Sequence, residues 1–490
     1  MKRNAKHILI AITIILLFLP MAQEHLRLFN FRKLAGVVSE KPKPPVKLKS
    51  ITDNSLQHWY ETYLRLHYGL REPLTRIYNQ YRWDLFKQSN SLGNKRNYIS
   101  DDGWIYEGTC VEEFYRGRFP ASDSAAMIRN FGEEALRLKQ IQQILESQNT
   151  HLFVLLLPGK EQVYPEHIPV TDDFPGRKPF SVRDFYAERF KELGVNHIDI
   201  GQWFLNIKDT VDYPLYPQTG THWSNYAAMH VADSLIRYME WLGNIKMEHF
   251  TIGERTERTV EPDDDLEQLM NLIRPLPKAP NYYAPYTIID DSTAARPTII
   301  TIGDSYYWNL LNATPFGKVM GDFKYWYYFN TVYFDEGHSL VDELDVMKEV
   351  LDADFVMIAY SPSQLYKMSQ GFSQKVLLDL CCDKDELDAA QQELTKAIKA
   401  NPVWVNSIIQ RTEQYEIPID TAIIIEARNG ILKSPNRFVP ALKDSVPTAR
   451  SERFMALTHH AEPQNDSQPQ SNPIPSDSTV SAPRLQQGSN

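Results

Sequence analysis

Two short motifs in this 490-residue chain contain the residue types of nucleophilic catalysis. The motif "GDS", ending at Ser305, follows an apolar run and precedes a stretch with helical spacing. A serine there lies near unpaired backbone N–H groups, which stabilise developing negative charge. The motif "GTHW" places His222 between a turn and a helical run, where it can serve as the base that a serine needs. The motifs together favour a pairing of Ser305 with His222, although Asp304 or Ser305 could simply cap the helix.

Short apolar runs alternate with helical patterns around these motifs. The four clearest runs cover residues 151–158, 195–200, 296–305 and 354–361. Such runs are typical of parallel strands covered on both faces. We therefore expect a three-layer α/β domain with a parallel sheet over about residues 96–370, and the aromatic run 324–334 predicts a further strand. Sites in such sheets form where strands end and helices begin, which is the place of Ser305.

The N-terminus has the features of an export segment. Lys2, Arg3 and Lys6 precede an apolar run from Ile8 to Ala22. The run is shorter than the roughly 20 residues that span a bilayer comfortably, and no clear small-x-small cleavage site follows it. These features favour an uncleaved signal anchor over residues 1–23, with a cleaved signal peptide as the alternative. Either would export the remainder of the chain.

The other segments differ in composition. Residues 24–55, which include a region rich in proline and lysine, predict an extended spacer. Apolar residues at three- and four-residue spacing predict helices at the start of the main domain, which we place at residues 56–370. Residues 371–455 predict a helical appendage. Residues 456–490 are rich in Ser, Pro, Gln and Asn, and we expect them to be disordered because they offer little apolar surface to bury.

Charge and cysteine content exclude several functional classes. The net charge is −10, and no long basic stripe is present, so nucleic acid is not an expected partner. Cys110, Cys381 and Cys382 lack metal-ligand spacing, although export would permit one disulfide from Cys110 to either of the others. We find no zinc-protease, phosphate-loop or dinucleotide motif. The segment 261–268, "EPDDDLEQ", resembles a cation site only loosely and fits an acidic loop better.

Five segments taken in order resemble one known family. They are "HYGLREPLTRIYNQ" (67–80), "DDGWIYEG" (101–108), "LLLPGKEQVYPEHIP" (155–169), "GTHWSNYAA" (220–228) and "TIGDSYYW" (301–308). Together they are similar to the AlgX/AlgJ-type alginate O-acetyltransferase family of SGNH-hydrolase-like proteins, over about residues 60–370. Histidine before serine is the permuted order of that family.

The resemblance implies an exported protein that transfers acetyl groups to hydroxyls of a polysaccharide. It implies a bacterial inner-membrane anchor with the main domain in the periplasm, or secretion to the periplasm after cleavage. A membrane-bound O-acyltransferase is the expected partner that supplies acetyl, and no metal or organic cofactor is expected beyond the acetyl donor. A carbohydrate acetylesterase and a non-catalytic glycan-binding envelope protein are the alternatives.

The resemblance also assigns residues. Ser305 would be the nucleophile that carries acetyl, and His222 its general base. The family's acid lies two residues before the histidine, where this chain has Gly220. Three interpretations follow: a Ser-His dyad, a substitute acid from elsewhere, or a site that binds glycan without turnover. Asp212 and Asp199 are the substitute acids suggested by sequence proximity.

Several other residues are weaker candidates. Asp304 fits the role of a turn-stabilising residue. Lys160 and Tyr164 match the family's Pro-x-Lys-x-x-x-Tyr block and could line the cleft, as could Trp223 beside the histidine. Trp326, with Tyr327 and Tyr328, could form a sugar-stacking platform, although alternating positions on a strand also fit a core.

Overall fold

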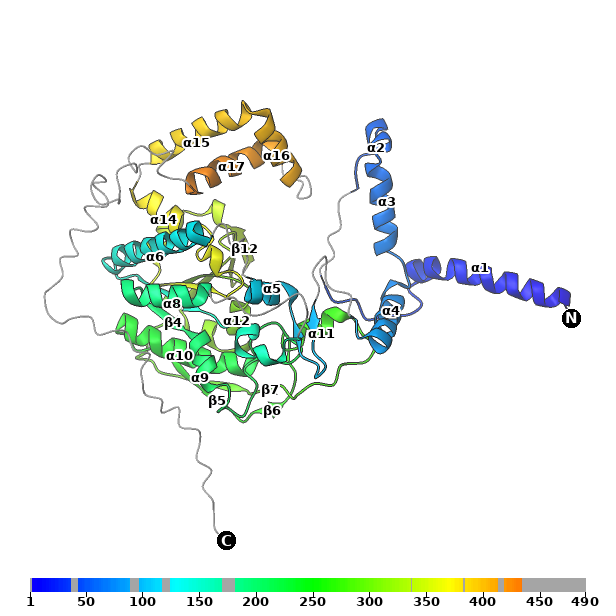
Figure 1. The fold of residues 1–490 in the computed structure, drawn as a ribbon, viewed down its shortest axis with the longest axis horizontal. Helices are drawn as coiled ribbons and strands as arrows, with labels where there is room; N and C mark the ends of the chain where they lie inside the picture. Colours follow the sequence, from blue (N-terminus) through cyan, green and yellow to red (C-terminus); the bar gives the residue numbers. More distant parts are fainter. Residues whose placement is uncertain are drawn as a thin grey trace, which may run out of the picture.

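The computed structural model describes most of the chain (Figure 1). The described residues are 2–36, 43–88, 97–116, 124–169, 181–335, 337–381, 384–412 and 418–433. The predicted disordered segment 456–490 lies outside them. So do residues 434–455 of the predicted helical appendage.

A seven-stranded sheet forms the centre of the fold. Its order is β12 (Gly337–Leu340), β11 (Thr331–Phe334), β10 (Asp322–Tyr327), β9 (Thr298–Gly303), β13 (Phe355–Tyr360), β3 (His151–Leu156) and β4 (His197–Asp199). The four predicted apolar strands are β3, β4, β9 and β13, and they pair in parallel with one another and with β10.

One edge of the sheet departs from the prediction of a purely parallel sheet. The aromatic run 324–334 is two strands, because the chain turns after β10 and returns antiparallel as β11. Tyr328 and Phe329 form this turn, and both have a φ of 51°. The strand β12 then pairs antiparallel with β11, so the sheet is mixed but mostly parallel.

Helices cover both faces of the sheet, as the apolar strands predict. Alternate strand residues face opposite sides: Phe153 belongs to one core cluster, and Val154 belongs to the other. The face to which Phe153 points is covered by α9 (Ile200–Ile207), α10 (Asn225–Gly243) and α12 (Tyr307–Ala313). The face to which Val154 points is covered by α6 (Ser124–Glu146), α8 (Val182–Leu193), α13 (Val346–Asp352) and α14 (Phe372–Cys381). The three-layer architecture is therefore confirmed.

Smaller elements surround this domain. They are β1 (Tyr98–Ile99), β2 (Ile105–Tyr106), α5 (Gly108–Arg116), α7 (Lys160–Val163), β5 (His249–Ile252), β6 (Thr256–Glu257), α11 (Asp265–Met270), β7 (Tyr282–Tyr283) and β8 (Tyr286–Ile289). Short 3₁₀ turns occur at Pro165–His167, Phe316–Val319, Val341–Glu343 and Leu365–Lys367. Among them, α11 turns out to matter most for the site.

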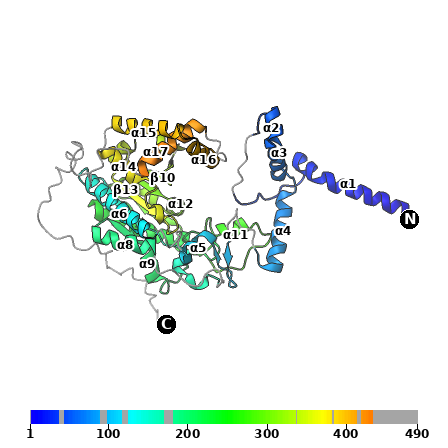
Figure 2. The ribbon, with the colours of Figure 1, turned by 45° about the horizontal axis from the view of Figure 1, so that its top comes forward.

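The N-terminal helices project from the domain (Figures 1 and 2). They are α1 (Lys2–Leu26), α2 (Leu48–Thr52), α3 (Ser55–Leu66) and α4 (Arg71–Phe86). Within α1, the window Leu9–Leu26 is long and apolar enough to cross a membrane, and only 6% of it is buried. The predicted spacer 24–55 is not wholly extended, because it contains the end of α1 and all of α2.

The C-terminal helices form a cluster of their own. The helices α15 (Lys384–Lys399), α16 (Pro402–Thr412) and α17 (Ile419–Lys433) share a small apolar core. In contrast, α14 contributes Phe372 and Val376 to the core of the main domain. The appendage predicted from residue 371 therefore begins only after α14.

Gly303 tests how tightly the central strands pack. A Cβ atom at this position would lie 2.6 Å from the carbonyl oxygen of Ala359 on β13. We predict that Gly303→Ala lowers the free energy of unfolding by about 1–3 kcal/mol, because the strands must separate. Guanidinium unfolding measures the change.

The matched control is Gly132→Ala in α6, where a Cβ atom would meet nothing within 4 Å. There the same substitution should raise the free energy of unfolding by about 0.5–1 kcal/mol, because alanine loses less entropy in a helix. Equal effects at the two positions would show that the close approach of β9 and β13 does not limit stability.

Candidate active site

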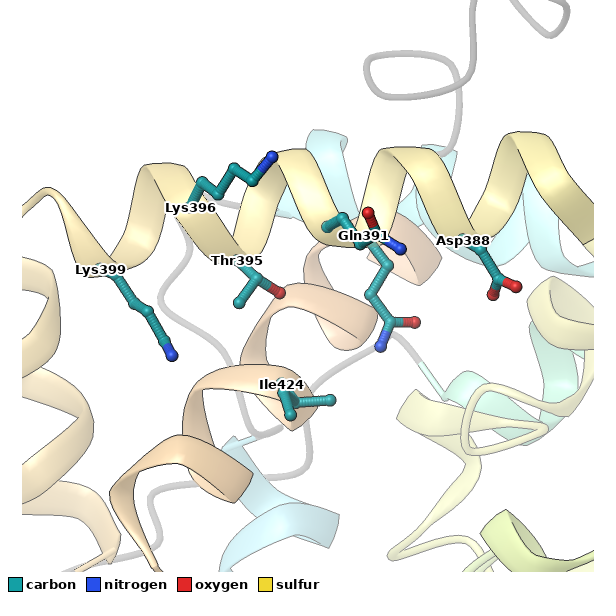
Figure 3. A pocket seen from close by; sticks show the side chains of 7 residues that line it. Asp388, Gln391, Thr395, Lys396, Lys399 and Ile424 are labelled. Atoms are coloured by element: carbon teal, nitrogen blue, oxygen red, sulfur yellow. The ribbon is translucent and has the colours of Figure 1, made fainter.

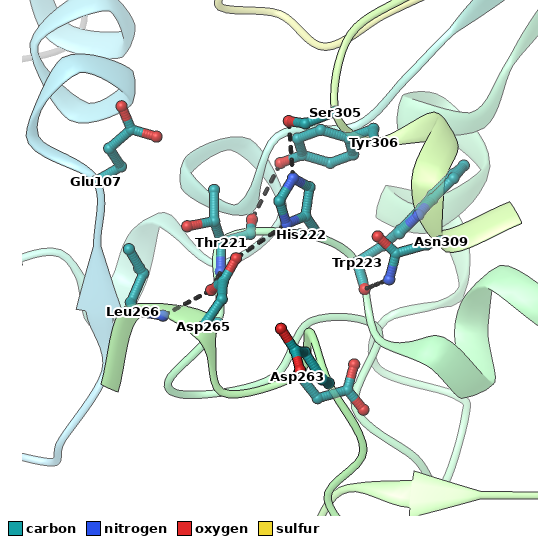
Figure 4. A network of polar contacts seen from close by, with 12 residues as sticks. Glu107, Thr221, His222, Trp223, Asp263, Asp265, Leu266, Ser305, Tyr306 and Asn309 are labelled. Carbon is teal, nitrogen blue, oxygen red and sulfur yellow. Dashed lines mark hydrogen bonds and ion pairs between the residues drawn. The ribbon is translucent and has the colours of Figure 1, made fainter. Parts of the chain in front are cut away.

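Ser305 and His222 lie side by side at the carboxyl edge of the parallel strands (Figure 4). The Nε2 atom of His222 is 2.9 Å from the Oγ atom of Ser305, although 83 residues separate them in the chain. Ser305 follows β9 directly, and His222 lies in the loop before α10. This distance allows the imidazole to accept the serine proton.

A carboxylate faces the other side of the imidazole. The Oδ2 atom of Asp265, the first residue of α11, is 3.0 Å from the Nδ1 atom of His222. Its Oδ1 atom accepts hydrogen bonds from the backbone N–H groups of Thr221 and Leu266, both at 2.7 Å. The main chain therefore fixes the carboxylate while its free oxygen orients the histidine. This is the arrangement of a serine, histidine and acid triad.

The acids suggested by sequence proximity are elsewhere. Asp212 is largely exposed and binds Arg255, with 2.7 Å between Oδ1 and Nη1. Asp199 binds Arg183 and caps α9. The prediction of Asp212 or Asp199 as the substitute acid is therefore wrong, because strong partners hold both carboxylates away from His222.

The surroundings of Gly220 explain why the acid is not there. A Cβ atom at Gly220 would lie 2.7 Å from Cγ of Pro217 and 2.8 Å from the carbonyl oxygen of Asp263. The acidic segment 261–268 thus occupies the space that a side chain at position 220 would need. The same segment brings Asp265 to the histidine.

The carboxylates of the acidic segment 261–268 face different partners. The Oδ1 atom of Asp263 accepts a hydrogen bond from Asn225 N at 2.9 Å. Asp264 accepts one from the side chain of Gln268 at 2.8 Å, and Asp265 faces the histidine. The three carboxylates thus have separate partners. Across the described residues, no group of three His, Cys, Asp or Glu side chains is arranged to hold a metal ion.

Asp304 has the turn-stabilising contacts that the sequence predicts. Its buried carboxylate accepts hydrogen bonds from the backbone N–H and the hydroxyl of Ser361, at 2.8 and 2.6 Å. It also accepts one from Tyr306 N at 3.2 Å. Burial raises the pKa of Asp304. The carboxylate ties the turn that carries Ser305 to the end of β13.

Tyr306 and Asn309, which follow Ser305 in the chain, bind the loop that carries His222. The sequence analysis did not identify either residue. The hydroxyl of Tyr306 donates to the carbonyl of Thr221 at 3.1 Å. The amide of Asn309 donates to the carbonyl of Trp223 at 3.3 Å. The carbonyls on both sides of His222 are thereby held from the serine side. A polar Asn309 in an apolar helical run was the one sequence signal for this role.

Lys160 lies beneath the histidine loop, not in an open cleft. Its buried ammonium donates to the carbonyls of Ile105, Gln218 and Gly220 at 2.7, 2.9 and 2.8 Å. Burial lowers the pKa of Lys160 to about 7, while the nearby Asp265 carboxylate opposes this shift. The predicted cleft-lining role of Lys160 is wrong, because all its donors bind the protein's own backbone.

Three aromatic candidates also have structural positions. Tyr164 is half-buried, and its hydroxyl accepts a hydrogen bond from Leu215 N at 3.4 Å. Trp223 and Trp326 are fully buried in the two core clusters, so neither can stack on a sugar. Tyr327 and Tyr328, at the end of β10, are half-buried.

Cys110 is a free cysteine in the described part of the chain, and Cys382, one of its two predicted partners, lies outside the described residues. A pocket elsewhere is lined by residues of α15 and α17 (Figure 3). These are Asp388, Gln391, Gln392, Thr395, Lys396, Lys399 and Ile424. Because all of them belong to the C-terminal cluster, this pocket is separate from Ser305.

A mostly parallel three-layer sheet with serine, histidine and a carboxylate at its carboxyl edge defines an SGNH-hydrolase-like domain. Residues 99–312, which include all three side chains, match the family described as SGNH hydrolase-like domain, acetyltransferase AlgX. This part of the chain is therefore similar to the AlgX type of SGNH-hydrolase-like acetyltransferase domain.

Similar proteins come from several bacteria. The chain is 24% identical over 216 residues to "Probable alginate O-acetylase AlgJ" of Pseudomonas aeruginosa, a match that covers 44% of this chain and 50% of that protein. The chain thus matches half the length of this relative. The O-acetyltransferase domain of Pseudomonas putida AlgJ is 16% identical, with a TM-score of 0.36, covering 55% of this chain and 92% of that one. Bacillus cereus PatB1 with a sulfonyl adduct is 13% identical, with a TM-score of 0.34, covering 57% and 100%.

Asp263 gives a pH-dependent prediction. Its Oδ2 atom is buried without a hydrogen-bond partner in the described part of the chain, and burial raises its pKa from 3.8 to about 7. The protonated form therefore stabilises the fold fully below about pH 4, and this contribution is lost as the pH rises through about 7. Asparagine resembles the protonated form. We predict that Asp263→Asn raises the free energy of unfolding by about 1–3 kcal/mol at pH 8.

The gain should shrink as the pH falls toward 4, which urea unfolding at several pH values can measure. A gain that is the same at every pH would show that Asp263 is ionised in the folded protein throughout.

Proposed function

We propose that this chain is an exported polysaccharide O-acetyltransferase that transfers acetyl through Ser305. The observation that carries the proposal is the unbroken series of contacts from Ser305 through His222 to Asp265. The match of residues 99–312 to an acetyltransferase family supports acyl transfer as the reaction class.

In the first step, Ser305 Oγ attacks the carbonyl carbon of the acetyl donor while His222 Nε2 takes the hydroxyl proton. Asp265 stabilises the resulting imidazolium. The tetrahedral intermediate then collapses, the bond to the leaving group breaks, and His222 returns the proton to that group. Acetyl remains as an ester on Ser305.

The negatively charged oxygen of the tetrahedral intermediate needs a hydrogen-bond donor to stabilise it. The backbone N–H of Ser305 makes no hydrogen bond to any residue that the structure describes. It lies in the turn before α12, which the carboxylate of Asp304 holds. A fixed N–H group at such a position stabilises an oxyanion without having to reorganise.

In the second step, a sugar hydroxyl replaces the leaving group. His222 takes its proton, the sugar oxygen attacks the acetyl carbon, and Ser305 Oγ leaves with the proton from His222. The products are the acetylated sugar and the free serine. If water attacks instead, the products are acetate and free enzyme, which is the acetylesterase alternative.

The non-catalytic alternative rested on Gly220, where the family's acid is missing. Asp265 supplies a carboxylate to the same imidazole nitrogen that a triad acid would bind. The geometry therefore favours an enzyme over a protein that only binds glycan.

The N-terminal helix supports a membrane location. The window Leu9–Leu26 is apolar and almost entirely unburied, unlike a core helix. We propose that α1 anchors the chain in the bacterial inner membrane, with the main domain in the periplasm. A membrane-bound O-acyltransferase would then be able to deliver acetyl to Ser305, and a polysaccharide would be the acceptor.

Covalent labelling tests the triad. We expect an arylsulfonyl fluoride to form one adduct, on Ser305, detected by intact mass, and Ser305→Ala and His222→Ala should abolish it. Asp265→Asn should slow acetyl-ester turnover by up to about ten-thousandfold, as for other triad acids. Asp212→Asn is the matched control and should react like the parent. If Asp265→Asn reacts at the parental rate, Ser305 and His222 work as a dyad and Asp265 is not part of the catalytic machinery.

A second assay separates transferase from esterase. The protein is given an activated acetyl ester with and without a hydroxyl-bearing oligosaccharide, and both released acetate and acetylated sugar are quantified. We expect acetyl on the sugar, with less acetate than in the sugar-free reaction, because the hydroxyl competes with water. Acetate alone, unchanged by the sugar, would assign the chain to the esterases.

A further inference from the structure

Helix α4 presents its apolar side to solvent. The side chains of Leu74, Ile77, Tyr78, Tyr81 and Leu85 are between 46% and 61% exposed. Their spacing of three and four residues places them on one face of the helix. Surface helices of globular proteins normally direct such a face toward the core.

The opposite face of α4 contacts the domain through buried polar side chains and through Trp83, which packs against a small apolar cluster of the domain. The amide of buried Asn79 donates to the carbonyl of Met270 at 2.8 Å. The side-chain oxygen of buried Gln80 accepts from the backbone N–H groups of Ile273 and Arg274 at 3.1 and 3.0 Å. These contacts hold α4 with its other, exposed apolar face directed away from the domain.

Helix α3 continues this surface. None of its residues is buried, and Tyr60, Tyr63 and Leu64 are between 42% and 64% exposed. We call residues 43–88, which contain α2, α3 and α4, the arm. The arm has eight Lys and Arg against four Asp and Glu, whereas the whole chain has a net charge of −10. The arm is therefore a basic, aromatic surface on an acidic protein.

The bend between α3 and α4 lies against the end of α1. A Cβ atom at Gly69 would be 2.3 Å from the carbonyl oxygen of Pro20 and 2.4 Å from the backbone nitrogen of Glu24. His67 Nδ1 is 3.8 Å from the Glu24 carboxylate. Both views show α1, α3 and α4 on the same side of the molecule (Figures 1 and 2). An anchored α1 would therefore bring the arm to the membrane surface.

We propose that the arm lies on an anionic lipid bilayer, with its tyrosines and aliphatic side chains at the boundary between headgroups and acyl chains. This inference rests on the proposed anchoring by α1. Tyrosine, arginine and lysine are the side chains that favour this boundary, and the excess basic charge complements anionic headgroups. The domain would then contact the membrane at two places, through α1 and through the outer face of α4.

Contact of the arm with the bilayer would also fix the position of the candidate active site. Met270, which binds Asn79, is the last residue of α11, and Asp265 is the first. The helix that carries the acid is therefore fixed to the helix that lies on the bilayer. This relation places Ser305 at a set position relative to the membrane.

Nitroxide labelling of the full chain in liposomes tests the inference. The native cysteines are replaced by serine, and single labels are placed by Ile77→Cys on the arm, Leu16→Cys in α1 and Trp241→Cys on α10. Ile77 and Trp241 are 54% and 55% exposed, so Trp241 is a matched control on the domain. Collisions with oxygen report lipid contact, and collisions with a nickel chelate report water contact. Retained sulfonyl labelling of Ser305 verifies folding.

We expect the Ile77 label to favour oxygen at least several-fold more than the Trp241 label in vesicles of phosphatidylglycerol and phosphatidylethanolamine. In phosphatidylcholine vesicles that preference should fall, while the Leu16 label should be unchanged. If the Ile77 label matches Trp241 while Leu16 contacts lipid, the arm inference is overturned and the apolar face is left for a protein partner. If Leu16 contacts water, the proposed anchor itself fails.

Discussion

The contact between Asp265 and His222 is the constraint on which the candidate site depends. It joins two segments that have no sequence relation, the loop before α10 and the start of α11. Buried polar groups fix both segments: Lys160 binds the histidine loop from below, and the backbone of Thr221 binds Asp265. Each of these contacts joins a side chain to a backbone atom, so the buried surroundings hold both the histidine loop and the carboxylate in place.

The architecture was largely predictable, because apolar strands and helical patterns report burial directly. The strands β3, β4, β9 and β13 lie close to their predicted ranges, and Ser305 and His222 meet as their motifs suggested. The acid was not predictable in the same way. Asp265 is one of three adjacent aspartates, and its side-chain direction depends on contacts with a loop 43 residues away. Proximity in sequence favoured Asp212, which Arg255 binds instead.

Three of the four substrate-binding candidates were wrong for a related reason. Trp223, Trp326 and Lys160 have side chains that bind sugars in other settings, and residue type alone cannot separate exposed from buried positions. Here the two tryptophans fill the layers beside the sheet, and Lys160 satisfies three carbonyls. The apolar face of α4 shows the opposite error, because a pattern that suggests burial belongs to exposed residues. Its periodicity is the same as that of an ordinary amphipathic helix packed on a core.

The segment 261–274 holds the acid but contributes little to the main core. It is attached by hydrogen bonds to α4 and to the histidine loop, and by a small apolar cluster of its own that includes Leu266 and Met270. Segments of this kind open at a lower free energy than the central strands of a domain. Local opening of this segment would separate acid from base while the sheet stays intact. Loss of activity on heating would then precede loss of the fold, and the enzyme's working temperature range would be set by one peripheral segment.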